Sequence, residues 1–174
     1  MKRRVAGRLI ASLILLQGLP APLFAGSFYV SSSGNDAGSG SQADPWRTIQ
    51  RALNSAYGGD TVEVMAGTYS EKITFPRSGS SDNFITLQGQ SGAVLSGQGL
   101  TKIGGGEYDP LVRLAGVSYI RIQGMTITNW KSSIRDEFLI GLFIQSNCHH
   151  VEISACQVSE IQQTYWNGNK SLSE

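Results

Sequence analysis

The sequence predicts an all-β parallel β-helix, a solenoid of about three to four coils that begins with a capping α-helix. Three segments that read almost alike support this prediction: they start at Phe84, Tyr119 and His150 with the letters FITLQGQ, YIRIQGM and HVEISAC. In each, two apolar residues alternate with a polar one, which is the period of a strand with one buried face. A Gly or Ala follows at a fixed offset, where the strand must bend. Self-similarity of this kind is typical of solenoids.

The spacing of equivalent apolar residues indicates the size of each coil. Ile85, Ile120 and Val151 open the alternating pattern in the three segments, and a looser fourth copy, TVEVMAG, places Val62 at the equivalent position before Ile85. All three intervals fall in the range of about 20–50 residues that repeats of this kind span. Such coils hold two or three short strands joined by loops of variable length. We therefore expect residues 61–161 to form the coils, with the longest loops at residues 76–83, 97–110 and 131–138.

Residues 1–25 read as a secretory signal peptide. A stretch with four basic residues precedes an apolar run over residues 9–16, and small residues follow near Ala25. The run is too short to span a bilayer, and no later segment is long and apolar enough to anchor the chain. We expect cleavage near Ala25 and a secreted or periplasmic protein, with an uncleaved anchor as the alternative.

The net charge argues against a nucleic-acid partner. Removing residues 1–25 takes away four of the 14 basic residues and none of the 13 acidic ones, which leaves a net charge of −3. A mildly acidic surface without a basic patch does not favour a polyanion such as nucleic acid. Hydrophobic residues make up 40% of the chain, so we expect a folded domain rather than a disordered chain despite the 21 glycines.

The expected N-terminal unit, residues 26–60, holds a short strand, a loop and one helix. Asp44 is the expected N-cap and Pro45 the first helical residue, while Gly58 and Gly59 end the helix. Its apolar stripe consists of residues spaced at i, i+3, i+4 and i+7, namely Ile49, Ala52, Leu53 and Ala56. We expect this stripe to cover the first coil.

The sequences of the last two expected coils align when one is shifted along the chain so that Ile122 matches Ile153. This shift places Arg121 beside Glu152 on the outer face, where we expect a surface ion pair. It also places both cysteines, Cys148 and Cys156, at apolar positions. We therefore expect the thiols to pack inside the coils, and a disulfide in an exported protein is the alternative.

A longer run carries a resemblance to a known family. The chain contains FYVSSSGNDAGSGSQADPWRTIQRALNSAYGGDTVEVMAGTY, followed by SGSSDNFITLQGQSGAVLSG. These letters combine a strand, a Gly-Asn-Asp loop, a helix, a Gly-Asp turn at residues 59–60 and a Gly-Thr-Tyr bend at residues 67–69. In this order the elements resemble the N-terminal portion of secreted right-handed parallel β-helix proteins of the pectate-lyase-like superfamily, over residues 28 to about 161.

The resemblance implies a right-handed solenoid and a carbohydrate partner. The superfamily includes polysaccharide lyases, hydrolases, epimerases and members without catalysis, so its fold alone does not define a reaction. Its lyases cleave acidic polysaccharides by β-elimination, which needs a cation on the uronate carboxylate, a base for the C5 proton and a proton for the leaving oxygen. An acidic polysaccharide is therefore the partner that the resemblance implies.

Four basic residues are the candidates for catalytic or substrate contacts. Lys72 follows the Gly-Thr-Tyr bend and Arg77 lies near it, while Lys131 and Arg135 belong to a charged loop. For all four, the alternative is a charge exposed to solvent without a partner function. Aromatic residues suited to stacking on sugar rings are present without a pattern, namely Tyr108, Trp130, Tyr165 and Trp166.

No cofactor is evident from motifs, although the resemblance implies Ca²⁺ for lyases of this kind. Asp36, in the Gly-Asn-Asp loop, is the candidate metal ligand, and a plain turn residue is the alternative. His149 and His150 are adjacent on an expected strand, where neighbouring side chains point to opposite sides. We therefore expect that these two histidines cannot share one metal ion.

Two functions are compatible with these observations. The first is a secreted, carbohydrate-associated protein related to uronan lyases but incomplete as an enzyme. The alternative is a non-catalytic surface or binding module, or a fragment of a longer β-helix protein. The β-helix enzymes that this chain resembles usually have eight or more coils, and residues 162–174 lack the pattern of a further coil. We therefore expect an irregular C-terminal tail, a truncated chain and an exposed last coil through which chains can self-associate.

Overall fold

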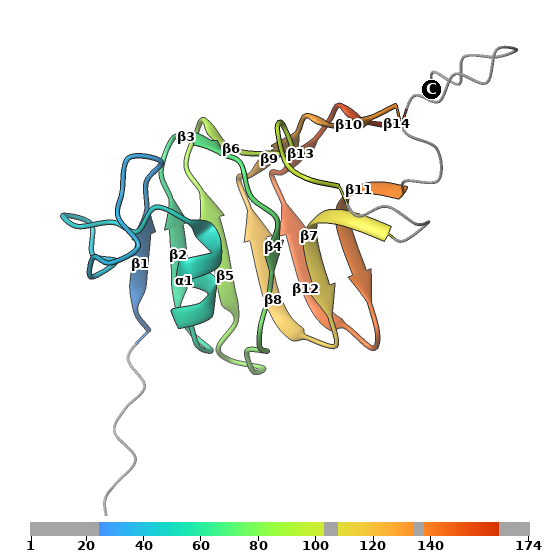
Figure 1. The fold of residues 1–174 in the computed structure, drawn as a ribbon. Helices are drawn as coiled ribbons and strands as arrows, with labels where there is room; N and C mark the ends of the chain where they lie inside the picture. Colours follow the sequence, from blue (N-terminus) through green and yellow to red (C-terminus); the bar gives the residue numbers. More distant parts are fainter. Residues whose placement is uncertain (1–24, 103–107, 134–137, 164–174) are drawn as a thin grey trace, which may run out of the picture.

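The computed structural model describes residues 25–102, 108–133 and 138–163. These residues form one helix and fourteen short strands. The strands wind through about four turns of a β-solenoid, with strands of successive turns lying side by side (Figure 1). The predicted fold class is therefore confirmed.

The elements have the following bounds in chain order. They are β1 (Ser27–Val30), α1 (Ile49–Ser55), β2 (Thr61–Val64), β3 (Gly67–Tyr69), β4 (Ile73–Thr74), β5 (Ile85–Gly89), β6 (Ala93–Ser96), β7 (Tyr108–Ala115), β8 (Ser118–Gln123), β9 (Thr126–Thr128), β10 (Trp130–Ser132), β11 (Phe138–Gln145), β12 (His149–Ser154), β13 (Gln157–Val158) and β14 (Ile161–Gln163).

Equivalent strands of successive turns stack into three sheets and one short pair. The strand orders are β1-β2-β5-β8-β12, β3-β6-β9-β13 and β4-β7-β11, with β10 paired to β14. Every one of these strand pairs is parallel. Since each turn adds a strand to the same sheets, the backbone hydrogen bonds run along the solenoid axis and join one turn to the next.

Columns of apolar side chains fill the interior. Ile120 aligns with Ile85 on one side and Val151 on the other, which confirms the predicted equivalence of these three residues. The predicted equivalence of Val62 and Ile85 is wrong, because Val62 aligns with Leu87. A slip by two positions leaves the same face of a strand buried, so hydrophobic alternation alone does not distinguish these two registers.

The helix α1 covers the first turn, as expected. Its stripe is fully buried, and the helix contacts β1, β2 and β4. The predicted N-cap at Asp44 is wrong, because Thr48 is the N-cap and its side chain accepts a hydrogen bond from the Arg51 N–H. Asp44 instead closes the preceding loop, where its carboxylate accepts the Ser39 N–H. Among the described residues, no helix has the length and apolar character needed to cross a bilayer.

Left-handed backbone occurs both between strands and near the start of strands, at positions that recur from one turn to the next. Gly124 and Ala155, the predicted bend residues of the last two turns, have φ angles of 70° and 52°. Tyr119 and His150 form a second pair, with φ angles of 57° and 52°. The second pair was not predicted, because left-handed backbone is uncommon for residues other than glycine.

The last two turns confirm the predicted surface ion pair. Arg121 pairs with Glu152 in the register of β8 and β12, and its Nε lies 2.6 Å from a Glu152 carboxylate oxygen. Cys148 and Cys156 are free thiols, partly buried against the core, as their apolar positions predicted.

Candidate functional site

Lys72 is engaged inside the fold rather than free at the surface. Its Nζ lies 2.7 Å from Oδ1 of Asp109, whose side chain is fully buried, and donates a hydrogen bond to the carbonyl oxygen of Thr101 at 2.8 Å. The same ammonium lies 4.9 Å from the centre of a Trp130 ring, within the range of a cation–π contact. Lys72 therefore joins the loop after β3 to the start of β7.

Arg77 supports the C-terminal end of the helix α1. Its Nη1 donates hydrogen bonds to the carbonyl oxygens of Asn54 and Ala56, at 3.1 and 2.5 Å. Its guanidinium also lies 4.3 Å from the centre of the Tyr57 ring. Terminal carbonyls of a helix lack partners within the helix, so a cation at this end is stabilising. This geometry gives Arg77 a structural role.

Asp36 supports the other end of the same helix. Its carboxylate accepts the backbone N–H groups of Arg47 and Thr48 at 2.8 and 2.9 Å, and the Thr48 hydroxyl at 2.8 Å. Burial raises the pKa of the Asp36 carboxyl, but hydrogen bonds from Thr48 and Arg47 and the charge of Arg51 outweigh it, so the net pKa lies below its usual value. These partners lie 11 and 12 positions along the chain, so the contacts are those of a carboxylate that supports a helix start rather than of a plain turn residue.

The carboxylate of Glu71 also supports the start of α1. It accepts the N–H groups of Ile49 and Gln50, the first two residues of α1, at 2.8 and 3.0 Å, whereas Asp36 accepts those of the two residues just before the helix. Burial raises the pKa of the Glu71 carboxyl above its usual value, against those two hydrogen bonds, and the negative charge of Asp36 acts in the same direction as burial.

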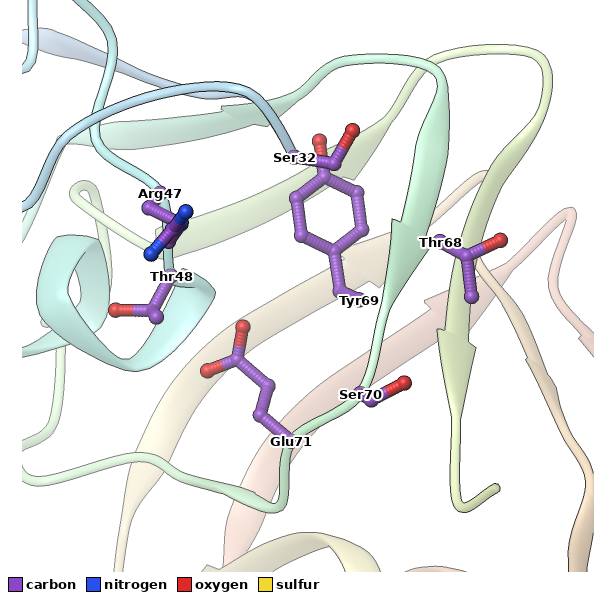
Figure 2. A pocket seen from close by; sticks show the side chains of 7 residues that line it. All are labelled: Ser32, Arg47, Thr48, Thr68, Tyr69, Ser70 and Glu71. Atoms are coloured by element: carbon purple, nitrogen blue, oxygen red, sulfur yellow. The ribbon is translucent and has the colours of Figure 1, made fainter. Parts of the chain in front are cut away.

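A pocket of about 240 Å³ lies beside this helix start. Figure 2 shows the Glu71 carboxylate directed toward α1 and the Tyr69 ring extended toward Ser32. The pocket is lined by Ser32, Arg47, Thr48, Thr68, Tyr69, Ser70 and Glu71. Its volume is below the ~300–1,000 Å³ typical of small-molecule sites. Because Glu71 and Thr48 both cap the helix, we assign this pocket to the N-terminal cap of the solenoid.

The prediction of a metal site at Asp36 stays untested. Within the described part of the chain, no group of three or more His, Cys, Asp or Glu side chains is placed to hold a metal ion. The oxygens of Asp36 accept hydrogen bonds from the N–H and hydroxyl groups already named. Ca²⁺ remains an expectation from the family resemblance.

The charged loop is described only in part. Lys131 lies on β10, and its Nζ is 2.9 Å from a carboxylate oxygen of Glu160, with both side chains about half exposed. This is a surface ion pair between neighbouring turns. Arg135, the fourth candidate, lies outside the described residues, as do Tyr165 and Trp166.

Trp130 does not present its ring to solvent. The side chain is fully buried, and its Nε1 donates to the carbonyl oxygen of Asp109 at 2.7 Å. Of the four aromatic candidates, Tyr108 is the one that the structure places at the surface, where 55% of it is exposed.

Tyr108 belongs to an aromatic cluster on β7 and β11, in which Phe143 is half-buried. Its ring lies 5.7 Å from Phe138 and 5.1 Å from Phe143, measured between ring centres. Phe138 is 47% exposed. The guanidinium carbon of Arg113 lies 6.0 Å from the Phe143 ring, and its Nη2 donates to the Tyr108 carbonyl oxygen at 3.3 Å. We call Tyr108, Arg113, Phe138 and Phe143 the aromatic-basic face.

Sequence reasoning missed three members of this face. Arg113 and Phe143 occupy paired positions in β7 and β11, between apolar residues that point inward, and Phe138 is paired with Tyr108. The sequence signal that could have found them is the identity of the outward-facing residues at equivalent positions of neighbouring turns. That comparison requires the register of β7 and β11, which differs by one position from the shift that relates β8 to β12.

Parallel sheets stacked around an apolar interior define a β-helix protein. Residues 28–173 match the family model described as "Pel9A-like, right handed beta helix region". The chain therefore belongs to the Pel9A-like right-handed β-helix family, which confirms the resemblance to pectate-lyase-like proteins.

One curated relative is similar over most of this chain. It is "Uncharacterized protein YwoF" of Bacillus subtilis (strain 168), 31% identical over 144 residues, which cover 81% of this chain and 30% of the relative. This chain thus spans about a third of the length of that relative.

Solved structures share the fold at low identity. A GH136 lacto-N-biosidase from Eubacterium ramulus matches with a TM-score of 0.64 at 17% identity, over 79% of this chain and 27% of the enzyme. A rhamnogalacturonan lyase matches with a TM-score of 0.51 at 15% identity, over 63% of this chain and 30% of the lyase. At these identities the matches show a common β-helix fold.

Proposed function

We propose that this chain binds a polysaccharide along the aromatic-basic face, as a carbohydrate-associated segment of a β-helix protein. The observation that supports the proposal is the cluster of exposed Tyr108 and Phe138 with half-buried Phe143, beside the guanidinium of Arg113. The family and the names of the two structural neighbours, a lacto-N-biosidase and a lyase of rhamnogalacturonan, support carbohydrate as the ligand class.

The chemistry of the face favours an acidic chain. Exposed aromatic rings offer apolar surface on which the C–H face of a sugar ring can pack. The guanidinium of Arg113 has donors arranged in a fork that matches a carboxylate, so a uronate is a better ligand than a neutral sugar. Lys72 also contacts β7, the strand of Tyr108 and Arg113, through its ion pair with Asp109. The Asp109 carboxylate balances most of the Lys72 charge.

The contacts of the basic candidates favour binding over catalysis by the described residues. Lys72 is paired with Asp109, Arg77 with the end of α1, and Lys131 with Glu160. A general base must reach the proton that it removes, and these three side chains are held by other partners. The second candidate function, β-elimination of a uronan, is supported by the named lyase among the neighbours and requires residues beyond these three.

Binding is tested with polygalacturonate, alginate and a neutral galactan, by affinity electrophoresis of the purified chain. We expect retardation by the acidic polymers, about 3- to 10-fold weaker affinity in Tyr108→Ala, and at least about 10-fold weaker affinity in Arg113→Gln. Tyr57→Ala is the matched control, because Tyr57 and Tyr108 are 58% and 55% exposed, and Tyr57 follows α1 whereas Tyr108 lies on β7. Equal loss in the control, or no retardation of the folded wild type, would contradict the proposal.

Catalysis is tested separately with the same polymers. Release of unsaturated uronate is followed by its absorbance, with added Ca²⁺ and with a chelator. We expect no product from this chain under either condition. Product formation that depends on Ca²⁺ would establish the lyase reading and the family expectation for the metal, whereas retardation without product would support a binding role.

We also propose that the protein is exported and that the last turn mediates association. The basic and apolar pattern of residues 1–25 supports secretion or periplasmic location, which N-terminal sequencing of the protein from the culture medium or periplasm tests. Exposed apolar residues in the last described turn support association.

A further inference from the structure

The two histidines of this chain lie next to each other on β12 and are both exposed. The expectation that they point to opposite sides is wrong. His150 has a φ angle of 52°, so the regular alternation of an extended strand is interrupted between them. As a result, Nδ1 of His149 lies 2.7 Å from Nδ1 of His150.

Tyr119, from the preceding turn, holds both rings in this arrangement. Its ring is stacked on His150, with a distance of 4.6 Å between centres and an angle of 15° between planes. The His149 ring meets Tyr119 edge-on, at 5.5 Å and 86°. Tyr119 itself packs edge-on against Phe84 of the turn before, at 5.7 Å. The two imidazoles therefore end an aromatic column that runs across three turns.

We propose that the two Nδ1 atoms form a binding site for a divalent transition metal of the Ni²⁺ or Cu²⁺ type. Imidazole nitrogens bind such metals at ~2.0–2.1 Å, which places two nitrogens about 2.9 Å apart at a right angle and about 3.4 Å apart at a tetrahedral angle. The 2.7 Å between the two Nδ1 atoms is closer to the right angle. Adjacent positions at right angles belong to square-planar and octahedral ions, and Ni²⁺ and Cu²⁺ take those geometries with nitrogen ligands.

The remaining positions of the metal are open to water. The described residues supply no third His, Cys, Asp or Glu to such a site. Glu152, the acidic residue on the same strand, is paired with Arg121 at 2.6 Å. A site with two protein ligands binds more weakly than a closed structural site, so we expect micromolar rather than nanomolar affinity.

A hydrogen bond between the two Nδ1 atoms requires that one of them carries a hydrogen. One Nδ1–H donates to the other Nδ1, and both rings remain neutral if each keeps one hydrogen. Metal binding requires both Nδ1 atoms as lone-pair donors, so the proton between them leaves for the exposed Nε2 of the same ring. Protons compete with the metal for the nitrogens, and the affinity therefore falls at acid pH.

The test is a titration of the chain, freed of any histidine tag, with NiCl₂ in a non-chelating buffer at pH 7.5. Calorimetry should give one Ni²⁺ per chain, and thermal unfolding should shift to higher temperature, because a ligand that binds only the folded state stabilises it. Ni²⁺ is preferred to Cu²⁺ as the probe because the two free thiols reduce Cu²⁺.

Two variants define the ligands and two define the role of the stack. His149→Gln and His150→Gln should each weaken Ni²⁺ binding at least tenfold and remove the thermal shift. Both rings are exposed, so these variants should fold like the wild type without metal. Tyr119→Ala should weaken binding several-fold and Tyr119→Phe should preserve it, because the phenyl ring keeps the stack.

The neighbouring thiol provides the control. Cys148 lies next to His149, and its Sγ donates to the Gln145 carbonyl oxygen at 3.0 Å. Cys148→Ser should bind Ni²⁺ like the wild type. The proposal is overturned if either histidine variant keeps wild-type affinity, if Cys148→Ser abolishes binding, or if Ni²⁺ lowers the unfolding temperature because the unfolded chain binds it better.

Discussion

The ammonium of Lys72 lies 2.7 Å from the carboxylate of Asp109, and this pair joins the segment before β4 to the start of β7 in the next turn. The side chain of Asp109 is fully buried, whereas 28% of the Lys72 side chain remains exposed. An ion pair in this position has a different energetic weight from one at the surface, because removing one partner leaves a desolvated charge behind.

We expect Lys72→Gln to destabilise the protein by roughly 2–3 kcal/mol, below the ~3–5 kcal/mol of a fully buried pair because Lys72 is partly exposed. Urea unfolding measures this loss. The double variant with Asp109→Asn should regain part of it, since no buried charge then lacks its cationic partner. Lys131→Gln, which removes the surface pair with Glu160, should cost no more than about 1 kcal/mol and serves as the control. Equal losses in both single variants would contradict the argument.

The low pKa of Asp36 predicts a pH-dependent contribution to stability. A carboxyl whose pKa is lower in the folded protein contributes stability when ionised, and this contribution is lost as the pH falls through the folded pKa. Asp36→Asn keeps an oxygen for the Arg47 and Thr48 N–H groups but loses the charge. We expect it to be less stable than the wild type by roughly 0.5–1 kcal/mol at pH 7. The difference should shrink below about pH 4.

Glu71 should show the opposite trend. Its pKa is raised in the folded protein, so the folded state takes up a proton more readily than the unfolded chain. The stability of the wild type therefore falls as the pH rises from the unfolded pKa of Glu71 through its folded pKa. As the pH is lowered, the wild type gains stability relative to Glu71→Gln. Unfolding midpoints of both variants and the wild type between pH 3 and 7 measure the two trends. Parallel curves for the two variants would show that neither carboxyl titrates as described.

The fold was predictable from the sequence because its determinants repeat. The alternation in Ile120 and Ile122, the common shift between the last two turns and the ion pair of Arg121 with Glu152 all follow from equivalent positions in neighbouring turns. The predicted register failed at Val62, where a slip by two positions keeps the same face buried. The repeated pattern therefore specifies the solenoid architecture, but it does not fix the register of the segment that contains Val62, where the pattern is weakest.

The candidate sites were less predictable, because their determinants do not repeat. The partner of Lys72 lies at the start of a strand in the next turn, and no local pattern marks Asp109 as buried. The meeting of His149 and His150 depends on one left-handed residue that is not a glycine. Both relationships come from backbone geometry that hydrophobic periodicity does not encode.

The equivalent bends at Gly124 and Ala155 predict opposite effects of exchanging their residues. Ala155 has a φ angle of 52°, a conformation that costs an L-residue about 1–2 kcal/mol. Ala155→Gly relieves this cost but adds chain entropy of about 0.5–1 kcal/mol, so we expect a net gain of about 0.5 kcal/mol. Gly124→Ala adds the same strain at a φ of 70°, and its Cβ would overlap the Gly89 carbonyl oxygen, so we expect a loss of at least about 2 kcal/mol.

Urea unfolding of the two variants tests this contrast. Ala93→Gly, in β6 and outside the left-handed region, is the control and should destabilise by about 1 kcal/mol. If Ala155→Gly loses as much stability as the control, the left-handed bend at Ala155 does not exist in solution.

The last described turn predicts concentration-dependent association. Ile122 and Ile127 are buried by the turn that stacks on them, whereas Ile153 and Val158, which align with them, are 44% and 53% exposed. Fully burying such a side chain contributes about 1.5–3 kcal/mol, so covering the exposed half of each contributes about 1 kcal/mol. Strands β12 and β13 also present one edge without a neighbouring strand among the described residues, and such an edge pairs readily with another chain.

We therefore expect light scattering after size exclusion to show a monomer at low micromolar concentration and a growing dimer fraction above it. Val158→Lys places a charge at this end and should lower the dimer fraction, while Gln98→Lys adds the same charge at an exposed position elsewhere and should not. At the opposite end of the described solenoid, the outer edge of β1 is already paired with a loop, because the Tyr29 N–H donates to the Gly40 carbonyl oxygen and the Trp46 N–H to the Tyr29 carbonyl oxygen. Association through the last turn therefore joins two chains end to end and stops there. Filaments, or a dimer insensitive to Val158→Lys, would place the contact on another surface.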